Sequence, residues 1–164
     1  MIIRVVEEQD TEAFLKLLRE VDDSNNMLFN PGERNTTVEK QRNIIKAFKN
    51  NPRSAFFIAE KNGELSGYIG IIAEDLQRTQ HIGRIVIGVS EQSRGLGIGT
   101  KLFQEVFEWI QGKYFTRLEL TVIVTNTAAI NLYEKMGFII EGKRIDSLNI
   151  DGQFVDEWSM YKRV

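Results

Sequence analysis

Val86 to Phe107, VIGVSEQSRGLGIGTKLFQEVF, joins three kinds of sequence: an apolar run, a glycine-rich turn and a periodic segment. The run Ile85–Val89 predicts a buried strand, because it is short, continuous and rich in β-branched residues. After the turn, apolar residues recur at helical spacing, at Leu102, Phe103, Val106, Phe107 and Ile110. This spacing predicts a helix with one apolar face, so the unit is strand, turn and helix.

The turn itself reads Arg94-Gly95-Leu96-Gly97-Ile98-Gly99. Its glycines let the backbone approach a ligand without side chains in the way. The first N–H groups of a helix have no intrahelical partner, and the helix dipole adds partial positive charge there. The turn therefore predicts an anion site, and a phosphate or pyrophosphate is the natural occupant. A tight strand-to-helix turn without a ligand is the structural alternative.

Two common phosphate-binding motifs are excluded by spacing. A Walker loop needs Gly-Lys-Ser/Thr after a four-residue spacer, whereas this chain has Gly99-Thr100-Lys101 and no such spacer. A dinucleotide-binding fold places its glycine fingerprint after the first strand of a parallel unit. Here the turn follows three strands that we expect to be antiparallel.

Composition narrows the function further. The chain has 164 residues, which predicts a single domain over 1–164. It has no cysteine and one histidine, so a disulfide, a cysteine nucleophile and a structural zinc site are all disfavoured. The net charge of −2 disfavours nucleic acid as a partner. The first ten residues, MIIRVVEEQD, resemble neither a signal peptide nor a membrane span, so we expect a cytoplasmic protein without a membrane partner.

The first half of the chain predicts two helices and the first strands. We expect a strand at Ile2–Val6, then a helix capped by Asp10 or Thr11 with a buried stripe. Thr36 or Thr37 caps the next helix, and Thr36 with Glu39 matches a capping box. Strands at 55–60 and 65–73 flank Asn62-Gly63, a type I′ hairpin signal, and a third strand covers 81–89.

The second half alternates strand and helix before a final hairpin. We expect a strand at 118–124, a helix capped at Asn126 that ends at Gly137, and strands at 138–150 and 153–162 around Asp151-Gly152. The whole predicts an α+β fold: a mixed, mostly antiparallel sheet of about seven strands flanked by about four helices.

Two segments together resemble the GNAT superfamily of acetyl-CoA-dependent N-acetyltransferases. Arg94, Gly97 and Gly99 fit its Gln/Arg-x-x-Gly-x-Gly/Ala turn. The stretch Asn126–Phe138, NTAAINLYEKMGF, is similar to its Asn-x-x-Ala-x-x-Leu-Tyr-x-x-x-Gly-Phe segment. The two motifs stand in the right order on the right elements, and the predicted element order also matches, so the resemblance covers nearly the whole chain and implies a GNAT-like fold.

The resemblance implies a set of acetyl-CoA contacts. The turn would hold the pyrophosphate through its main chain, and the preceding strand would pair its backbone with the pantetheine arm. Asn126 contacts the cofactor or fixes its loop in similar proteins, although a helix cap explains it equally well. The cofactor residues are therefore Ile87, Gly88, Val89, Arg94, Gly95, Leu96, Gly97, Ile98, Gly99, Thr100, Asn126 and Tyr133.

The catalytic residue implied by the family is Tyr133, as the acid that protonates the departing thiolate. A phenol with a pKa near ~10 can donate to a thiolate whose thiol has a pKa near ~8.5. A core aromatic is the alternative for Tyr133. Direct attack by the amine in a ternary complex is favoured, because the chain has no cysteine and its serines lack a histidine partner.

The general base is open, since the strand before the turn has no carboxylate where many relatives place a glutamate. Glu33, Glu119, Asp156 and His81 are the candidates, each better explained as a solvated or structural group, and proton loss through water is the preferred interpretation.

For the acceptor, the resemblance points to the loop 24–34 and the terminal hairpin, with Phe29, Glu33 and Asp156 as substrate-binding residues. We expect a primary amine of a small molecule, such as a polyamine or amino acid, or a protein N-terminus. The alternative is an acyl-CoA-binding regulatory module with the same fold and little catalysis. Relatives often form dimers, so a homodimer is also expected.

Overall fold

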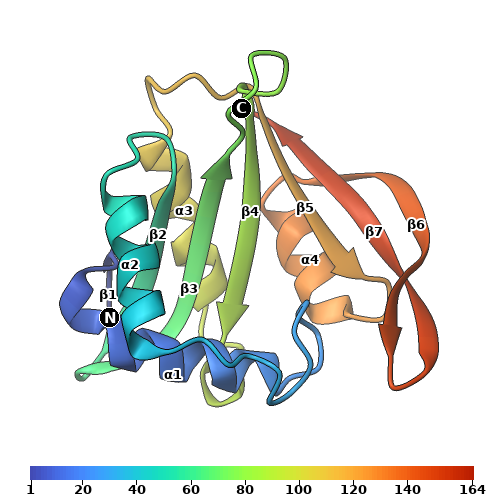
Figure 1. Cartoon of the computed structure of the whole chain (residues 1–164). Coiled ribbons are helices and arrows are strands. Elements are labelled where there is room, and N and C mark those ends of the chain that lie inside the picture. The colour runs from blue at the N-terminus through green and yellow to red at the C-terminus, as the bar shows by residue number, and fades with distance from the viewer. The chain divides into compact units, whose positions relative to one another are not determined.

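The computed structural model describes all residues, 1–164. Eleven helices and strands follow one another in the order β1 (Ile2–Val5), α1 (Thr11–Asp22), α2 (Val38–Lys49), β2 (Ala55–Lys61), β3 (Glu64–Ala73), β4 (Ile82–Val89), α3 (Ile98–Trp109), β5 (Arg117–Ile123), α4 (Thr127–Lys135), β6 (Ile139–Ile150) and β7 (Gln153–Arg163) (Figure 1). Short 3₁₀ turns occupy Glu8–Asp10 and Glu91–Ser93. The predicted α+β fold class is confirmed.

The strands form one seven-stranded sheet in the order β1-β2-β3-β4-β5-β7-β6. The pairs β1–β2, β2–β3, β5–β7 and β6–β7 are antiparallel, and β4 with β5 is parallel. The chain divides into two compact units, 1–72 with 86–113 and 73–85 with 114–164, so strand β4 runs through both. The single domain expected over 1–164 stays a prediction.

In the first unit, neighbouring residues of β2 show which helix covers which face. Phe56 packs against Phe14 of α1 at 5.8 Å and Phe48 of α2 at 4.7 Å between ring centroids. Phe57 packs against Trp109 of α3 at 6.0 Å. Successive side chains of a strand point to opposite faces, so α1 and α2 cover one face of this part of the sheet and α3 covers the other.

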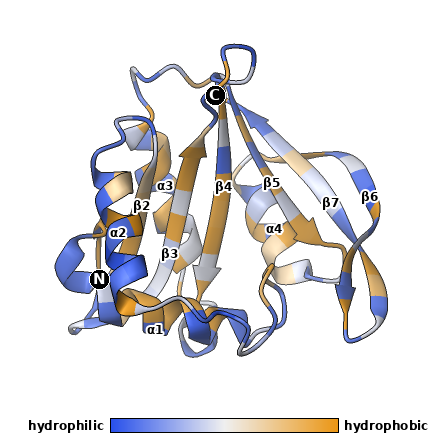
Figure 2. Ribbon diagram, viewed as in Figure 1, coloured by the Kyte–Doolittle hydropathy of each residue, from blue (hydrophilic) through white to orange (hydrophobic).

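The core of this unit forms from the apolar faces of α1 and α3, which the spacing of apolar residues in the sequence predicts. Phe14, Leu17, Leu18 and Val21 of α1 are buried, as are Leu102, Phe103 and Val106 of α3. Between them β3 and β4 are largely hydrophobic (Figure 2), as expected for strands covered on both faces.

The second unit is built on the β6–β7 hairpin and on β5. Leu118, Leu120 and Val122 of β5 are buried and, standing two residues apart, lie on one face of the strand. The hairpin turns at Asp151 and Gly152 with φ of 52° and 80°, and Asn62 and Gly63 in the first unit have φ of 55° and 80°. Positive φ at both central positions is the type I′ geometry that both dipeptides predict.

Of the helix caps predicted in the first unit, the side-chain cap of α1 is wrong and the cap of α2 is confirmed at Thr37. Asp10 precedes α1 but makes no side-chain cap, because its carboxylate binds Arg4 at 2.7 Å and the N–H of Glu7 at 2.8 Å. Those bonds lower the pKa of Asp10, with the Arg4 hydrogen bond as the largest cause. Thr37 caps α2 by accepting from the N–H of Lys40 at 3.2 Å, so the capping box expected at Thr36 does not form.

No helix of the structure combines the length and the apolar character that crossing a membrane requires.

Candidate active site

The glycine turn enters α3 through two left-handed residues. Gly95 has φ of 75° and Gly97, the residue before the helix, has φ of 76°. A side chain would be strained at either position, so the sequence needs glycine there for its backbone angle. Left-handed residues alternating with ordinary ones turn successive N–H groups toward a common point, the geometry of an anion-binding nest.

The main-chain donors of this turn are unused. The N–H groups of residues 95–100 donate no hydrogen bond within the chain, whereas those of Arg94 and Lys101 on either side bind Glu91 and Gly97 carbonyls. The first turn of α3 holds no acidic residue that competes for these donors. Six consecutive N–H groups at the N-terminus of α3 are therefore left without a partner in the chain, and a diphosphate could accept hydrogen bonds from them.

Close packing holds this end of α3 on the sheet. Ile98 is buried, and a Cβ added at Gly67 of β3 would lie 3.0 Å from its Cγ2 atom. Glycine at 67 thus lets the start of α3 lie directly on β3. On the opposite face, a Cβ at Gly88 would meet Val21 at 2.6 Å and Tyr68 at 2.7 Å, so α1 approaches β4 as closely as α3 approaches β3.

The end of β4 has main-chain groups outside the sheet's ladders. The N–H of Ser90 binds the carbonyl of Ser66 at 3.0 Å, and backbone groups alternate sides along a strand. The N–H and C=O groups of Val89 and Ile87 therefore point away from β3. The parallel ladder of β4 with β5 comprises only Ile82–Arg84, so these groups have no strand partner there. The carbonyl of Val89 accepts one long contact, from Arg94 Nε at 3.4 Å.

Asn126 and Tyr133 belong to α4 in the second unit. Asn126 caps the helix, its Oδ1 accepting from the N–H of Ala129 at 3.3 Å, so the predicted cap is confirmed. Tyr133 is buried, its ring lies 6.3 Å from that of Phe138, and burial raises the pKa of its phenol. Gly137 ends the helix with φ of 88°. The cofactor and acid roles of Asn126 and Tyr133 stay predictions.

The predicted acceptor residues are engaged locally. Phe29 lies under the guanidinium of Arg34, with Cζ 4.3 Å from the ring centroid. Glu33 accepts from the N–H of Asn30 at 2.7 Å within its own loop. Asp156, in the second unit, accepts from the N–H of Asp146 at 2.9 Å. Their acceptor roles stay predictions.

Of the two further candidates for the base, Glu119 has a side-chain partner and His81 is held through its main chain. Glu119 forms an ion pair with Arg117 at 2.6 Å. The carbonyl of His81 accepts from the N–H of Thr116 at 3.0 Å, which fixes the start of β4 in the second unit. No group of three or more metal-ligating side chains occurs in the structure.

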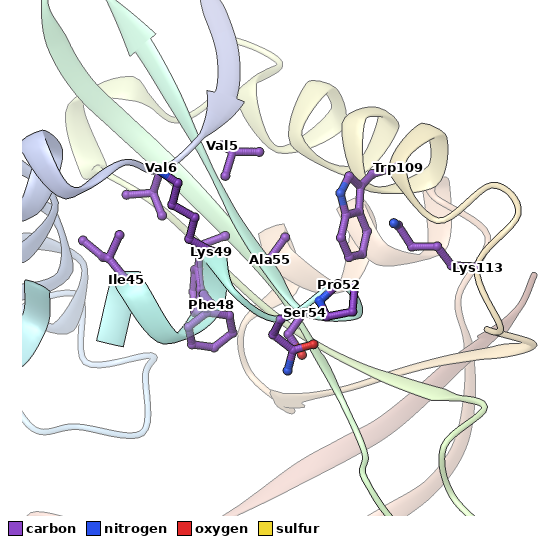
Figure 3. Close-up of a pocket in the computed structure, with 12 residues that line it drawn as sticks. Val5, Val6, Ile45, Phe48, Lys49, Pro52, Ser54, Ala55, Trp109 and Lys113 are labelled. Carbon is purple, nitrogen blue, oxygen red and sulfur yellow. The ribbon is translucent and has the colours of Figure 1, made fainter. Parts of the chain in front are cut away.

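The first unit contains two cavities. One, of about 280 Å³, lies where β1 and β2 meet the C-terminal ends of α2 and α3, with Phe48, Pro52 and Trp109 in its wall (Figure 3). Trp109 is the last residue of α3, so this cavity is at the opposite end of that helix from the glycine turn. The other, of about 260 Å³, lies between α1, α2 and the sheet and includes Val86 of β4.

Two features near the second cavity were missed from sequence. Arg34 pairs with Asp22 at 2.6 Å, and Gln41 of α2 is 4% exposed. A signal existed for Gln41, because it stands four residues before Ile45 and seven before Phe48, on the apolar stripe of its helix. Gln41 is not among the residues predicted for the site.

Comparison with known proteins places the chain in a family. The sequence profile of the acetyltransferase (GNAT) family matches residues 18–138. L-amino acid N-acetyltransferase AaaT of Escherichia coli (strain K12) is 31% identical over 103 residues, which are 60% of this chain and 62% of that protein. The chain spans less than two thirds of the length of this relative and of two other curated N-acetyltransferases.

Solved structures show the same fold. The acetyltransferase of GNAT family from Streptococcus pneumoniae superposes with a TM-score of 0.94 at 28% identity, covering 99% of this chain and 98% of that one. A GNAT superfamily phosphinothricin acetyltransferase from Sinorhizobium meliloti, in complex with acetyl-CoA, superposes with a TM-score of 0.87 at 16% identity, covering 99% and 88%. The predicted family and fold are confirmed: the chain belongs to the acetyltransferase (GNAT) family.

Proposed function

We propose that the protein transfers the acetyl group of acetyl-CoA to a primary amine, and that the glycine turn holds the pyrophosphate of this cosubstrate. The observation that carries the proposal is the row of N–H groups over residues 95–100, none of which is used within the chain. Membership of the acetyltransferase family supports the reaction. The acetyl-CoA bound by the Sinorhizobium meliloti protein supports the choice of ligand.

The reaction is a direct transfer in a ternary complex. The neutral amine attacks the thioester carbonyl, a C–N bond forms, the C–S bond breaks and the thiolate leaves. The N–H of Val89 would stabilise the developing oxyanion. Tyr133 would protonate the thiolate. The amine loses its proton through water, since the strand Ile82–Val89 carries no carboxylate.

The acceptor is an amine of a small molecule or a protein N-terminus. The Escherichia coli relative, an L-amino acid N-acetyltransferase, supports the amino acid class. The alternative, an acyl-CoA-binding module with little turnover, predicts the same cofactor binding but no thiol release. A thiol-release assay with acetyl-CoA and a panel of amines separates the two.

The placement of the cosubstrate is tested by thermal unfolding with matched glycine variants. Acetyl-CoA at one hundred times its Kd should stabilise the protein by about 2.7 kcal/mol. Gly97→Glu should abolish this effect, because it puts a carboxylate among the phosphate-binding N–H groups. Gly112→Glu is the control: Gly112 also has a left-handed φ, 72°, and open space around it, but lies beyond the far end of α3. Equal stabilisation of both variants by acetyl-CoA would contradict the placement of its pyrophosphate at the glycine turn.

A further inference from the structure

We infer that the cavity at the C-terminal ends of α2 and α3 binds a small aromatic carboxylate, separately from the site of the cosubstrate. We name it the Trp109 cavity, after the indole in its wall (Figure 3). All of its lining residues belong to the first unit. Three observations carry the inference, which does not depend on the proposed function: an aromatic wall, hydrogen-bond donors without a partner, and a lining that holds cations but no carboxylate.

Aromatic rings and a proline form much of the wall. Phe48 of α2 packs edge to face against Phe56 of β2, with ring centroids 4.7 Å apart. In Figure 3 the indole of Trp109 extends from α3 toward Pro52, and Phe48 reaches in from α2. The volume of about 280 Å³ has room for one aromatic ring with a short acidic arm. Aromatic pairs favour edge-to-face and offset contacts, so this wall suits a planar apolar ring.

The wall also carries donors that the protein itself does not use. The ammonium groups of Lys49 and Lys113 form no ion pair and no hydrogen bond within the chain. The side chain of Asn51 accepts through Oδ1 from the N–H of Arg53 at 2.8 Å, while its Nδ2 group donates no hydrogen bond. No buried side-chain nitrogen or oxygen of the protein lacks a partner, so these donors are open to a ligand. A carboxylate has two acceptor oxygens for them.

The charges of the lining favour an anion over an amine. Two lysines line the Trp109 cavity and no aspartate or glutamate does. Lys113 Nζ lies 4.2 Å from the centroid of the Trp109 ring, so a cation and the aromatic wall adjoin. Lys49 ends α2, where a cation also stabilises the helix through its dipole, with or without a ligand. A carboxylate would meet two opposite charges here, whereas an ammonium group would meet two like charges.

The Trp109 cavity is distant from the glycine turn. The helix α3 runs from Ile98 to Trp109 and rises 1.5 Å per residue, so its two ends are about 17 Å apart. None of the residues predicted for the cosubstrate or the acceptor lines the cavity. A ligand bound there therefore leaves the proposed pyrophosphate site free.

The two tryptophans of the chain provide a matched readout. Trp109 lies under Lys113 in the cavity, and Trp158 of β7, in the second unit, lies under Lys143 at 4.8 Å. Phenylacetate is titrated into isotope-labelled protein while NMR follows the two indole N–H signals, which Trp158→Phe assigns. The Trp109 signal should shift and saturate, and the Trp158 signal should stay in place. A Trp109 signal that does not respond, or equal shifts of both signals, would overturn the inference.

Two further probes separate the ring from the charge. Phenylacetamide keeps the ring without the charge and should bind about five-fold more weakly than phenylacetate, the effect of a partly exposed ion pair. Acetate keeps the charge without the ring and should cause no saturable shift, because it buries almost no apolar surface. Equal affinities for phenylacetate and phenylacetamide would overturn the carboxylate, and equal affinities for phenylacetate and acetate would overturn the aromatic ring.

Lysine variants test the charges directly. Lys113→Met and Lys49→Met should each weaken phenylacetate about five-fold and leave the affinity for phenylacetamide unchanged, since methionine keeps an apolar stem and removes the cation. Lys143→Met is the matched control, because Lys143 also lies over a tryptophan but not in this cavity, and it should change neither affinity. Equal losses for the acid and the amide would make the lysines packing residues and overturn the inference.

Other outcomes are distinguishable in the same experiments. If a second copy of the chain covers the Trp109 cavity, the Trp109 signal changes with protein concentration and phenylacetate causes no saturable shift, which overturns the inference. Acetyl-CoA should stabilise Lys113→Met as much as the unaltered protein. A protein that releases no thiol would contradict the proposed function and leave the phenylacetate result standing.

Discussion

Arg34 donates through Nε to the carboxylate of Asp22 at 2.6 Å, and this carboxylate is almost fully buried at the end of α1. A second hydrogen bond joins Arg34 Nη2 to Asp22 at 3.2 Å, and the guanidinium lies over the ring of Phe29. One side chain thus ties the loop between α1 and α2 to the core. Because Arg34 also lines the cavity between α1, α2 and the sheet, the loop and this cavity share the ion pair.

Breaking this pair from one side should be costly. Arg34→Met leaves the Asp22 carboxylate buried without a counterion, so the free energy of unfolding should fall by about 3–5 kcal/mol. The double variant Asp22→Asn with Arg34→Met should lose less free energy of unfolding than the sum of the losses in the two single variants. Urea denaturation measures all three. Lys16→Met is the control, since Lys16 is in an exposed pair with Glu20 and its loss should change stability by less than about 1 kcal/mol. If the losses of the two single variants simply add in the double variant, Arg34 and Asp22 are not coupled and the prediction is wrong.

A second prediction concerns the contact that seats α3. In Gly67→Ala, the new methyl group would lie 3.0 Å from Ile98 Cγ2 and 3.1 Å from the carbonyl of Gly88, which is tighter than most Cβ contacts in proteins. The helix start must shift, so stability should fall by about 1–3 kcal/mol and acetyl-CoA should bind more weakly. Gly142→Ala is the control, since no atom lies within 4 Å of the added carbon, and its stability should change little or rise. Binding of acetyl-CoA to Gly67→Ala is measured by calorimetry, and an unchanged affinity would contradict the prediction.

Much of the fold could be predicted because its signals are local. The Asn62-Gly63 turn needs two positive φ angles, and few dipeptides adopt them. The α3 stripe is set by the spacing of Leu102, Phe103 and Val106, all buried. Asp10 shows the limit. Its cap was expected from sequence position alone, but Arg4, six residues earlier, takes the carboxylate.

The candidate site also has features that the local sequence predicts and features that it does not. The glycine turn could be predicted, because the φ angles of Gly95 and Gly97 are a property of the turn itself. The Asp22–Arg34 pair could not, since it joins residues twelve apart across a loop without periodicity. The cavity between α1, α2 and the sheet depends on helices and strands meeting over Tyr68, which no local pattern encodes. Gln41 is the intermediate case, visible as a polar residue on an apolar stripe but without an assigned purpose.

A third prediction separates the two explanations of Asn126. Asn126→Ala removes the cap on the N–H of Ala129 and should lower stability by about 1 kcal/mol. Asn126→Ser keeps a capping oxygen and should restore most of that loss. If Asn126 also contacts the cosubstrate, the affinity for acetyl-CoA should stay low in Asn126→Ser although stability recovers. Full recovery of both, measured by calorimetry and urea denaturation, would limit Asn126 to the cap.

A fourth prediction concerns Tyr133 in catalysis. Tyr133→Phe removes the proton donor, so turnover should fall by at least about 100-fold while the affinity for acetyl-CoA changes little. Steady-state kinetics with calorimetry of acetyl-CoA binding measure both. An equal loss of turnover and affinity would make Tyr133 a packing residue against Phe138.

The pH dependence of stability gives a second readout of the same side chain. Burial raises the pKa of Tyr133 above its ordinary value of 10.0, so above pH 10 the unfolded chain releases a proton that the folded protein retains. The unfolded state then binds fewer protons, and stability falls by up to about 1.4 kcal/mol per pH unit as pH rises through this range. Between pH 10 and 11, the free energy of unfolding, measured by urea denaturation, should fall less steeply for Tyr133→Phe than for the unaltered protein. Identical slopes would mean that the phenol ionises as freely in the folded protein as in water.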